Sequence, residues 1–313
     1  MRIYLKLFLT AMCWSGTFIA GRLLAGEVSP LSASFLRFLI AAVLLLILTH
    51  RAHGRLPRPS GRQLAGLTVL GLTGVVSYNL FFFKGLTYVT AGRASVIIAT
   101  NPILITLIAA VIFRESLHRY KVLGVVISVC GAVIAISQGD PAALLKGSLG
   151  GGDGFIFCCV LSWVAYTLVG KAVLAGLSPL VAVAYSALIG TVGLGVAAMG
   201  AGLLERVGTF SLVNWLSLAY LGIFGTVIGF IWYYEGIRAI GAGRASLFIN
   251  FVPLGAILMG YLFLGEPVTL SLVAGTLLVV GGVYLTSITP KKKTVSDAAL
   301  KKNSVCGRVD THI

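Results

Sequence analysis

The sequence predicts an all-α integral membrane protein whose ten transmembrane helices form two inverted five-helix repeats. Three observations predict this fold class: 58% of the 313 residues are hydrophobic, only 11% are charged, and long apolar runs recur along the whole chain. Soluble domains carry about 25% charged residues. Only helices and closed barrels satisfy the backbone in lipid, and these runs lack the alternation of barrel strands.

Ten apolar runs have roughly the length that a helix needs to cross the hydrocarbon core, which is about 20 residues. In order they are 3–24, 31–49, 64–86, 91–113, 122–137, 154–174, 180–199, 213–234, 242–264 and 270–288. The first run continues through Trp14 without a small-residue cleavage site. It is therefore expected to be a spanning helix and not a removed signal peptide.

The Lys and Arg residues predict the orientation of the chain. If the N-terminus is cytoplasmic, most of the 24 basic residues lie on the cytoplasmic side, and the exceptions are Arg22, Arg37, Lys84, Arg93, Lys146 and Arg206. Cytoplasmic loops carry an excess of Lys and Arg, so both termini are expected in the cytoplasm. The net charge of +15 reflects these loops, and the sequence offers no polar domain for binding nucleic acid. Membrane lipid is the expected partner of the basic tail, 290–313.

The chain repeats one five-helix unit. The stretch "AGRASVIIATNP" begins at Ala91, and "AGRASLFINFVP" begins at Ala242, 151 positions later. The same shift pairs further residues without a gap, among them Gly71 with Gly222, Gly74 with Gly225, Pro102 with Pro253 and Glu115 with Glu266. A shift of 149 aligns the front of each half, pairing Trp14 with Trp163 and Pro30 with Pro179. Because five is odd, the second copy enters the membrane from the opposite side, so the two halves are inverted.

Four segments follow from this duplication. They are the first repeat at 1–138, a Gly-rich linker at 139–153, the second repeat at 154–289 and the tail at 290–313. Inverted repeats suit alternating access, because exchanging the conformations of the halves turns an outward-open cavity into an inward-open one. A cavity at the repeat interface would bind a small-molecule substrate near the middle of the membrane.

A further matched motif lies at the end of each repeat. The segments "FRESLHRYKVLGVVISVCG" and "FLGEPVTLSLVAGTLLVVGG" both place a glutamate ahead of spaced glycines. With the ten predicted helices and the duplicated unit, they resemble the drug/metabolite transporter superfamily, specifically its EamA-type exporters, over residues 6–287. Within it, the chain most resembles bacterial exporters of aromatic and other amino acids. The resemblance implies efflux of small metabolites across a bacterial plasma (inner) membrane.

Two prolines mark the predicted middle of the bundle. Pro102 lies 11 residues after Ala91, about 16 Å along a helix and near mid-membrane, and Pro253 has the same place in its copy. A proline inside a helix lacks an N–H and displaces the carbonyl four residues earlier. Ile98 and Ile249 are therefore each expected to present a free carbonyl oxygen.

Three polar residues are candidates for substrate binding. Asn101 and Asn250 lie beside the two prolines and are expected to face the bundle interior, because an unpaired amide is costly in hydrocarbon. Their amides would bind a polar head group, with hydrogen bonding between helices as the alternative. Arg37, within the second apolar run, either snorkels outward or binds a substrate carboxylate.

Several amphipathic side chains lie away from the membrane interfaces that Trp and Tyr prefer. A mid-membrane indole needs an internal partner or a wet cavity. An aromatic-lined cavity is one interpretation, and bundle packing is the other. The candidates are Trp14, Trp163, Tyr78, Asn79, Tyr166 and Tyr234.

Other classes of function fit the sequence less well. All four histidines lie in loops or the tail, and neither HExxH nor CxxC occurs, so no enzyme, metal site or cofactor is predicted. Glu115 and Glu266 suit N-terminal helix capping. A facilitative channel-like pore, or an exporter of drugs or other metabolites, is the alternative function. A monomer is expected, and both proton coupling and facilitated diffusion stay open.

Overall fold

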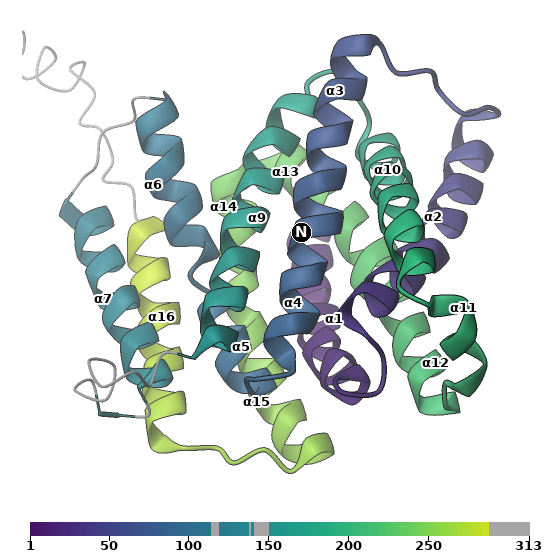
Figure 1. Ribbon diagram of the computed structural model, residues 1–313. Helices are drawn as coiled ribbons and strands as arrows, with labels where there is room; N and C mark the ends of the chain where they lie inside the picture. Colours follow the sequence, from purple (N-terminus) through teal and green to yellow (C-terminus); the bar gives the residue numbers. More distant parts are fainter. Residues whose placement is uncertain (114–118, 138, 141–149, 288–313) are drawn as a thin grey trace, which may run out of the picture.

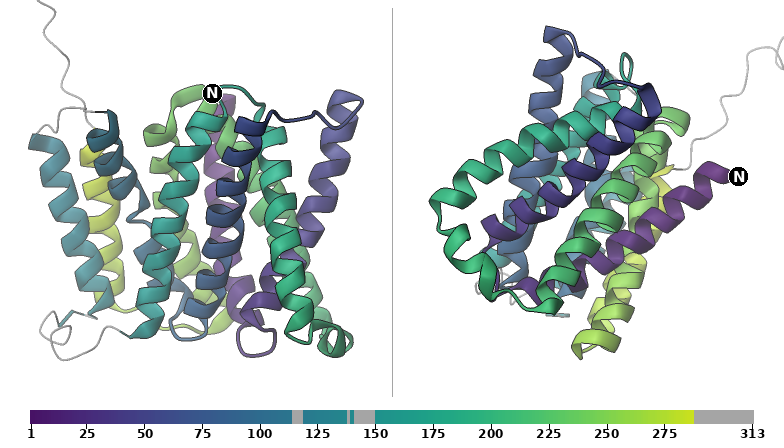
Figure 2. Two further views of the ribbon diagram at one scale, coloured as in Figure 1. Left: turned by 45° about the horizontal axis from the view of Figure 1, so that its top comes forward. Right: turned by 90° about the vertical axis from the view of Figure 1, so that its right-hand side faces the viewer.

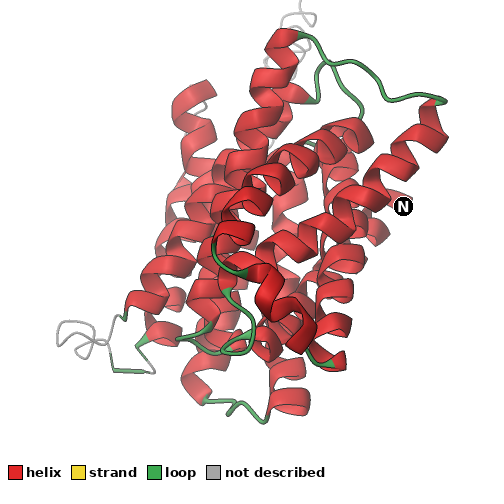
Figure 3. Ribbon diagram, turned by 45° about the vertical axis from the view of Figure 1, so that its right-hand side comes forward, coloured by secondary structure: helices red, strands yellow, loops and turns green. Residues whose placement is uncertain are grey.

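The computed structural model describes residues 1–113, 119–137, 139–140 and 150–287. Every regular element in these ranges is a helix (Figure 3). Glu115, most of the Gly-rich linker and the basic tail at 290–313 lie outside the described residues.

The first half folds into helices that follow the first five apolar runs (Figure 1). They are α1 (Arg2–Leu24), α2 (Pro30–His53), α3 (Gly61–Leu70) continued by η1 (Gly71–Ser77) and α4 (Tyr78–Leu86), α5 (Ala91–Ile98) followed by α6 (Asn101–Phe113), and α7 (Arg119–Ile136).

The second half repeats this order. Its helices are α9 (Gly151–Val173), α10 (Pro179–Gly200), α12 (Leu212–Tyr220) continued by η3 (Leu221–Ile228) and α13 (Gly229–Ile240), α14 (Ala242–Ser246) with η4 (Leu247–Asn250) and α15 (Phe251–Leu264), and α16 (Leu270–Ser287). Two short elements, α11 (Leu203–Arg206) and η2 (Val207–Thr209), connect α10 to α12.

The chain is an all-helical membrane protein by the length and composition of its helices. Among the described residues, seven helices are long and apolar enough to cross a membrane, and three shorter apolar helices accompany them at Ala91–Ile105, Val122–Ala135 and Leu270–Leu285. The ten segments coincide with the ten apolar runs of the sequence. The seven longer helices have 22 to 29 residues, which meets the roughly 20 residues that the hydrocarbon core demands.

Matching sequence signals start the second helix of each half. The Ser29 hydroxyl accepts a hydrogen bond from Ser32 N at 3.1 Å, and Pro30 is the first residue of α2. The Ser178 hydroxyl accepts from Val181 N at 3.3 Å, ahead of Pro179 in α10. Serine satisfies an N–H that has no partner inside the helix, and proline at the first helical position has no N–H to lose.

Each half contains one π-helical segment, at Gly71–Ser77 and at Leu221–Ile228. The segments occupy corresponding positions under the shift of 151 residues. π-Helical turns are rare and are frequent at functional sites. The sequence analysis did not predict them, although a pair of glycines, Gly71 with Gly74 and Gly222 with Gly225, marks both.

The fourth apolar segment of each half is broken into separate helices. α5 ends at Ile98 and α6 begins at Asn101, whereas the 3₁₀ segment η4 separates α14 from α15. Pro102 and Pro253 follow these interruptions directly and are both buried. A proline cannot supply the N–H that would continue the preceding helical turn.

Two helix pairs lie on opposite flanks of the bundle (Figures 1 and 2). α7 packs on α16 at one flank, and α2 packs on α10 at the other. The first pair is held close by small residues: a Cβ added at Gly131 would lie 2.7 Å from the Gly275 carbonyl oxygen. Small residues let helix backbones approach closely in membranes, where apolar burial gives little drive for association.

The two AGRAS segments lie at opposite ends of α1. Near its start, the Tyr4 ring lies 6.0 Å from the ring of Phe248, which follows the second AGRAS. Near its end, Arg22 Nε lies 3.5 Å from Glu266 Oε1, and the same oxygen accepts a hydrogen bond from Ala91 N of the first AGRAS. α1 has 23 residues and so a length of about 34 Å. The end that carries Ala91 is the predicted outer end, since the distribution of Lys and Arg predicts that it faces the outside of the cell.

Candidate functional site

A narrow cavity lies in the interior of the bundle, and the space in it open to water-sized molecules is about 30 Å³. Both halves contribute side chains to its wall, which is mostly aromatic and aliphatic. The lining residues are Trp14, Thr17, Phe18, Arg37, Tyr78, Phe82, Ile98, Asn101, Trp163, Phe230, Ile249 and Val252. Ligand sites are typically apolar clefts with a few placed polar groups, which describes this wall.

Five of the nine predicted substrate-binding residues line this cavity, and four do not. Trp14, Arg37, Tyr78, Asn101 and Trp163 line the cavity. The residues that are buried but do not line it are Asn79, Tyr166, Tyr234 and Asn250. The sequence analysis missed Thr17, Phe18, Phe82, Phe230 and Val252 as lining residues, because nothing local distinguishes them from other apolar helix positions.

Trp163 is the centre of an aromatic cluster. Its ring centroid lies 5.2 Å from those of Trp14, Tyr78 and Phe230, and 5.1 Å from that of Tyr166. Such pairs contribute about 0.5–1.5 kcal/mol each beyond the burial of their area. The cluster therefore packs α1, α4, α9 and α13 against one another and forms one wall of the cavity.

Arg37 is 3% exposed and stays in the bundle interior, so it does not snorkel to the membrane surface. Its Nε donates a hydrogen bond to Thr226 Oγ1 at 2.9 Å, and its Nη1 donates to Asn79 Oδ1 at 2.8 Å. Both acceptors are neutral. Within the described part of the chain, no carboxylate forms an ion pair with Arg37.

The π-helical segments hold the two partners of Arg37 in place. Thr226 donates to the Leu221 carbonyl oxygen, five residues earlier, at 3.0 Å. Asn79 Nδ2 donates to the carbonyl oxygens of Val75 at 2.9 Å and Gly74 at 3.2 Å. A π-helical turn widens the backbone spacing and leaves carbonyls that side chains can reach. The local distortion thus orients the oxygens that face the guanidinium.

The two equivalent tryptophans differ in their hydrogen bonding. Trp14 Nε1 donates to the Gly225 carbonyl oxygen at 3.0 Å. In the other half the corresponding carbonyl, that of Gly74, accepts from Asn79 instead. Trp163 Nε1 is buried and has no hydrogen-bond partner. A buried N–H without a partner costs about 1–3 kcal/mol. The Trp163 side chain lines the cavity and carries a hydrogen-bond donor that no described residue uses.

Asn101 supplies a hydrogen bond to a backbone carbonyl at the helix break before Pro102. Its Nδ2 donates to the Ile98 carbonyl oxygen at 2.8 Å. The expectation that Ile98 presents a free carbonyl is therefore wrong, because the neighbouring amide reaches it within the same turn. The Asn101 Oδ1 atom is buried without a partner, as is Oδ1 of Asn250.

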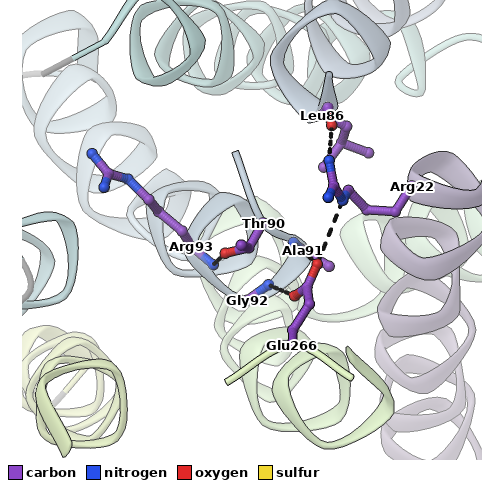
Figure 4. Close-up of polar contacts among 7 residues, drawn as sticks. All are labelled: Arg22, Leu86, Thr90, Ala91, Gly92, Arg93 and Glu266. Atoms are coloured by element: carbon purple, nitrogen blue, oxygen red, sulfur yellow. Dashed lines mark hydrogen bonds and ion pairs between the residues drawn. The ribbon is translucent and has the colours of Figure 1, made fainter. Parts of the chain in front are cut away.

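Glu266 caps a helix of the other half at the predicted outer end (Figure 4). Its carboxylate accepts hydrogen bonds from Ala91 N at 3.0 Å and Gly92 N at 3.3 Å, at the start of α5. Arg22 lies beside it and donates through Nη1 to the Leu86 carbonyl oxygen at 2.7 Å. Carboxylates stabilise helix N-termini, whose N–H groups are free and carry partial positive charge. The predicted capping role is thus fulfilled across the repeat interface and not at the start of α16.

A second ionic contact joins the halves at the same end. Arg93 Nε lies 2.7 Å from Asp153 Oδ1, and Arg93 Nη2 lies 2.6 Å from Asp153 Oδ2. The paired geometry is the strong, two-bond form of the arginine–carboxylate contact. Both side chains are largely buried, at 18% and 7% exposure. At the other end, Lys6 lies 2.6 Å from Glu235, with both side chains about a third exposed.

Among the described residues, no group of three or more His, Cys, Asp or Glu side chains could hold a metal ion. The described cysteines, Cys13, Cys130, Cys158 and Cys159, are free thiols. The side chains that line the cavity offer hydrogen-bonding groups, one cation and aromatic faces.

Apolar helices in two matching halves, with a mostly apolar cavity between them that holds a few polar groups, suit a membrane transport protein. The chain belongs to the EamA-like transporter family, which matches residues 1–137 and again residues 150–288. The double match agrees with the duplicated halves. The resemblance seen in the sequence is thereby confirmed.

Curated relatives extend over nearly the full chain. The "Uncharacterized transporter YyaM" of Bacillus subtilis (strain 168) is 28% identical over 303 residues, which covers 96% of this chain and 99% of the relative. The "Probable terminal-alkyne amino-acid exporter" of Streptantibioticus cattleyicolor is 28% identical over 278 residues, covering 88% and 90%. A solved structure shares the fold with a TM-score of 0.66 at 19% identity, over 92% of this chain and 99% of its own.

Proposed function

We propose that this transporter exports amino acids, aromatic or other, or related small metabolites, by alternating access around the central cavity. The observation that carries the proposal is a buried cavity whose wall is shared by both halves and contains polar groups with unused hydrogen-bonding capacity. Buried polar atoms are usually satisfied, so unpartnered ones beside a cavity suit a ligand that completes them. The relative described as a probable amino-acid exporter supports the substrate class and the direction.

The proposal includes ten membrane spans in two inverted repeats. It is supported by the position of the two AGRAS segments at opposite ends of α1. Cysteine labelling tests it at Tyr88 and Ala239, which are equivalent under the shift of 151 residues and both exposed. In a background without native cysteines, Tyr88→Cys should react with an impermeant reagent from outside the cell, and Ala239→Cys only after the cells are opened. Labelling of both positions from one side would contradict the inverted arrangement.

Reconstituted flux tests the function itself. Purified protein in proteoliposomes should move at least one member of a panel of radiolabelled amino acids with saturable kinetics and exchange. Comparing flux with and without a pH gradient separates proton coupling from facilitated diffusion. Linear, non-saturating flux would identify a channel-like pore, and transport of drugs but no amino acid would identify the alternative substrate class.

Two variants connect the flux to the cavity. Asn101→Ala and Trp163→Ala each remove a cavity-lining side chain with a buried polar atom that lacks a partner, and each is expected to abolish flux while membrane expression is retained. Normal flux in both variants would place substrate binding elsewhere in the bundle.

A further inference from the structure

We propose that the cavity selects substrates that carry a carboxylate, and that Arg37 is the residue that binds this group. The inference rests on the proposed transport function and specifies the substrate class of the same cavity: a carboxylic acid with an apolar or aromatic body. Arg37 is thereby a specificity-determining residue and not a structural cation.

The charge of the cavity is the first ground. Arg37 lines the cavity at 3% exposure, and its two hydrogen-bond partners, Thr226 and Asn79, are both neutral. Carboxylates of the described chain that form ion pairs, such as Asp153 and Glu266, do so with other cations at the predicted outer end. A charge buried in a membrane protein without a counter-ion is costly. An anionic substrate group would supply the missing counter-charge.

The geometry of the guanidinium is the second ground. The hydrogen bonds through Nε and Nη1 use two of its five N–H groups and fix the plane of the fork. Two N–H groups on the same edge of an arginine guanidinium can bind both oxygens of one carboxylate, and the unused N–H groups of Arg37 are candidates for such a contact. Gly225 packs beside this group, since a Cβ added there would lie 3.3 Å from Arg37 Nη2. The guanidinium is therefore held in one position before substrate binds.

Two further groups at the wall complement an acid substrate. Trp163 Nε1 is a buried donor without a partner, and Asn101 Oδ1 is a buried acceptor without a partner. The indole N–H can donate to a carboxylate oxygen, and the amide oxygen can accept from an N–H or O–H of the substrate. The neighbouring wall, with Phe18, Phe82 and Phe230, offers apolar contact to the body of the molecule.

Comparison of the halves separates a binding role from a structural one. The residue equivalent to Arg37 is Ser186, and the equivalents of Asn79 and Thr226 are Phe230 and Val75. The fold of the repeat therefore forms without this cation and its two partners. The charge is present in one repeat and lines the central cavity, as a binding group would.

The test uses the full-length protein in proteoliposomes preloaded with radiolabelled L-phenylalanine or another amino acid that the panel shows to be transported. Competitors are offered in matched pairs, the acid and its amide, such as phenylalanine and phenylalaninamide. The wild type should be inhibited about 10- to 100-fold more strongly by the acid than by the amide, as expected for loss of a hydrogen-bonded charge pair. Equal inhibition by both would overturn the proposal, whereas no transport of any compound would instead overturn the proposed function.

Variants assign the preference to one residue. Arg37→Gln should lose the difference between acid and amide, and Arg37→Lys, which keeps the charge without the fork, should retain part of it. Arg244→Gln is the matched control, because Arg244 is exposed at the end of the bundle away from the predicted outer end. A folded Arg37→Gln protein that still prefers the acid would overturn the assignment. If that variant does not fold, the Arg37→Lys protein and the wild-type competition decide it.

Discussion

The two AGRAS segments have the same five residues and different surroundings. In the first, the N-terminus of α5 is capped by Glu266 and Arg93 is paired with Asp153, both from the second half. In the second, α14 follows Gly241, whose φ is +86°, and Arg244 is exposed. The position equivalent to Asp153 holds Tyr4. The two identical motifs thus make different contacts, because the other half supplies different partners to each.

The same lesson holds inside the cavity. Trp14 donates to a backbone carbonyl of η3, whereas the N–H of its equivalent, Trp163, has no partner among the described residues, and the corresponding carbonyl accepts from Asn79. Tyr78 lies against Trp163, but its equivalent is Gly229, where an added Cβ would lie 2.5 Å from Trp14 Nε1. The backbone frame is duplicated, but the two halves place different side chains and hydrogen bonds on it.

Breaking the Arg93 and Asp153 contact should have the largest effect on this asymmetry. Asp153→Ala leaves a largely buried guanidinium without its carboxylate, which costs about 2–4 kcal/mol. The midpoint of thermal unfolding in detergent should fall by several degrees. Arg244→Ala, the control in the second copy, should change it little. A double variant with Arg93→Ala should recover part of the loss, and additive losses would show that the contact contributes no coupling energy.

Removing the charge of Glu266 should have the next largest effect. Glu266→Gln keeps one acceptor for the start of α5 but loses the attraction to Arg22 and to the helix N-terminus, about 1–2 kcal/mol together. Glu235→Gln at the other end breaks an ion pair that is about a third exposed, so it should cost less than about 1 kcal/mol. Equal stability of the two variants by thermal unfolding would remove the contrast between the ends.

The two tryptophans give a matched pair with a smaller expected effect. Trp14→Phe and Trp163→Phe delete the same atoms, but only the first breaks a hydrogen bond and leaves the Gly225 carbonyl oxygen without it. Trp14→Phe should therefore be about 1 kcal/mol less stable than Trp163→Phe. Flux should follow the reverse order, with Trp163→Phe the weaker transporter. If stability and flux changed in parallel in Trp14→Phe and Trp163→Phe, the predicted difference between the two tryptophans would be wrong.

Ser186→Ala should have the smallest effect. Ser186 is the equivalent of Arg37, and its hydroxyl donates to the Val183 carbonyl oxygen of its own helix at 3.1 Å. Its loss should cost about 1 kcal/mol or less and leave flux and acid preference unchanged. A loss of acid preference in this variant would assign the selectivity to both halves and not to Arg37 alone.

The sequence by itself determined the membrane class, the positions of the helices and the duplication. The reason is that these depend on local properties: apolar runs long enough for the bilayer, serine and proline at the starts of α2 and α10, and glycines and prolines that recur at fixed shifts. The burial of Asn101 and Trp163 could be expected on the same basis, because polar groups avoid lipid.

Only the tertiary structure decided which polar atoms find partners. The Ile98 carbonyl accepts from Asn101, Glu266 reaches across to α5, and the equivalent carbonyls of Gly74 and Gly225 accept from Asn79 and Trp14. Each outcome depends on atoms from separate helices meeting within hydrogen-bond distance, and shifts of about an ångström decide such contacts. Apolar length and repeat spacing carry no information at that scale. The sequence therefore predicts the helices and their duplication, but not which polar atoms at the centre of the bundle are paired.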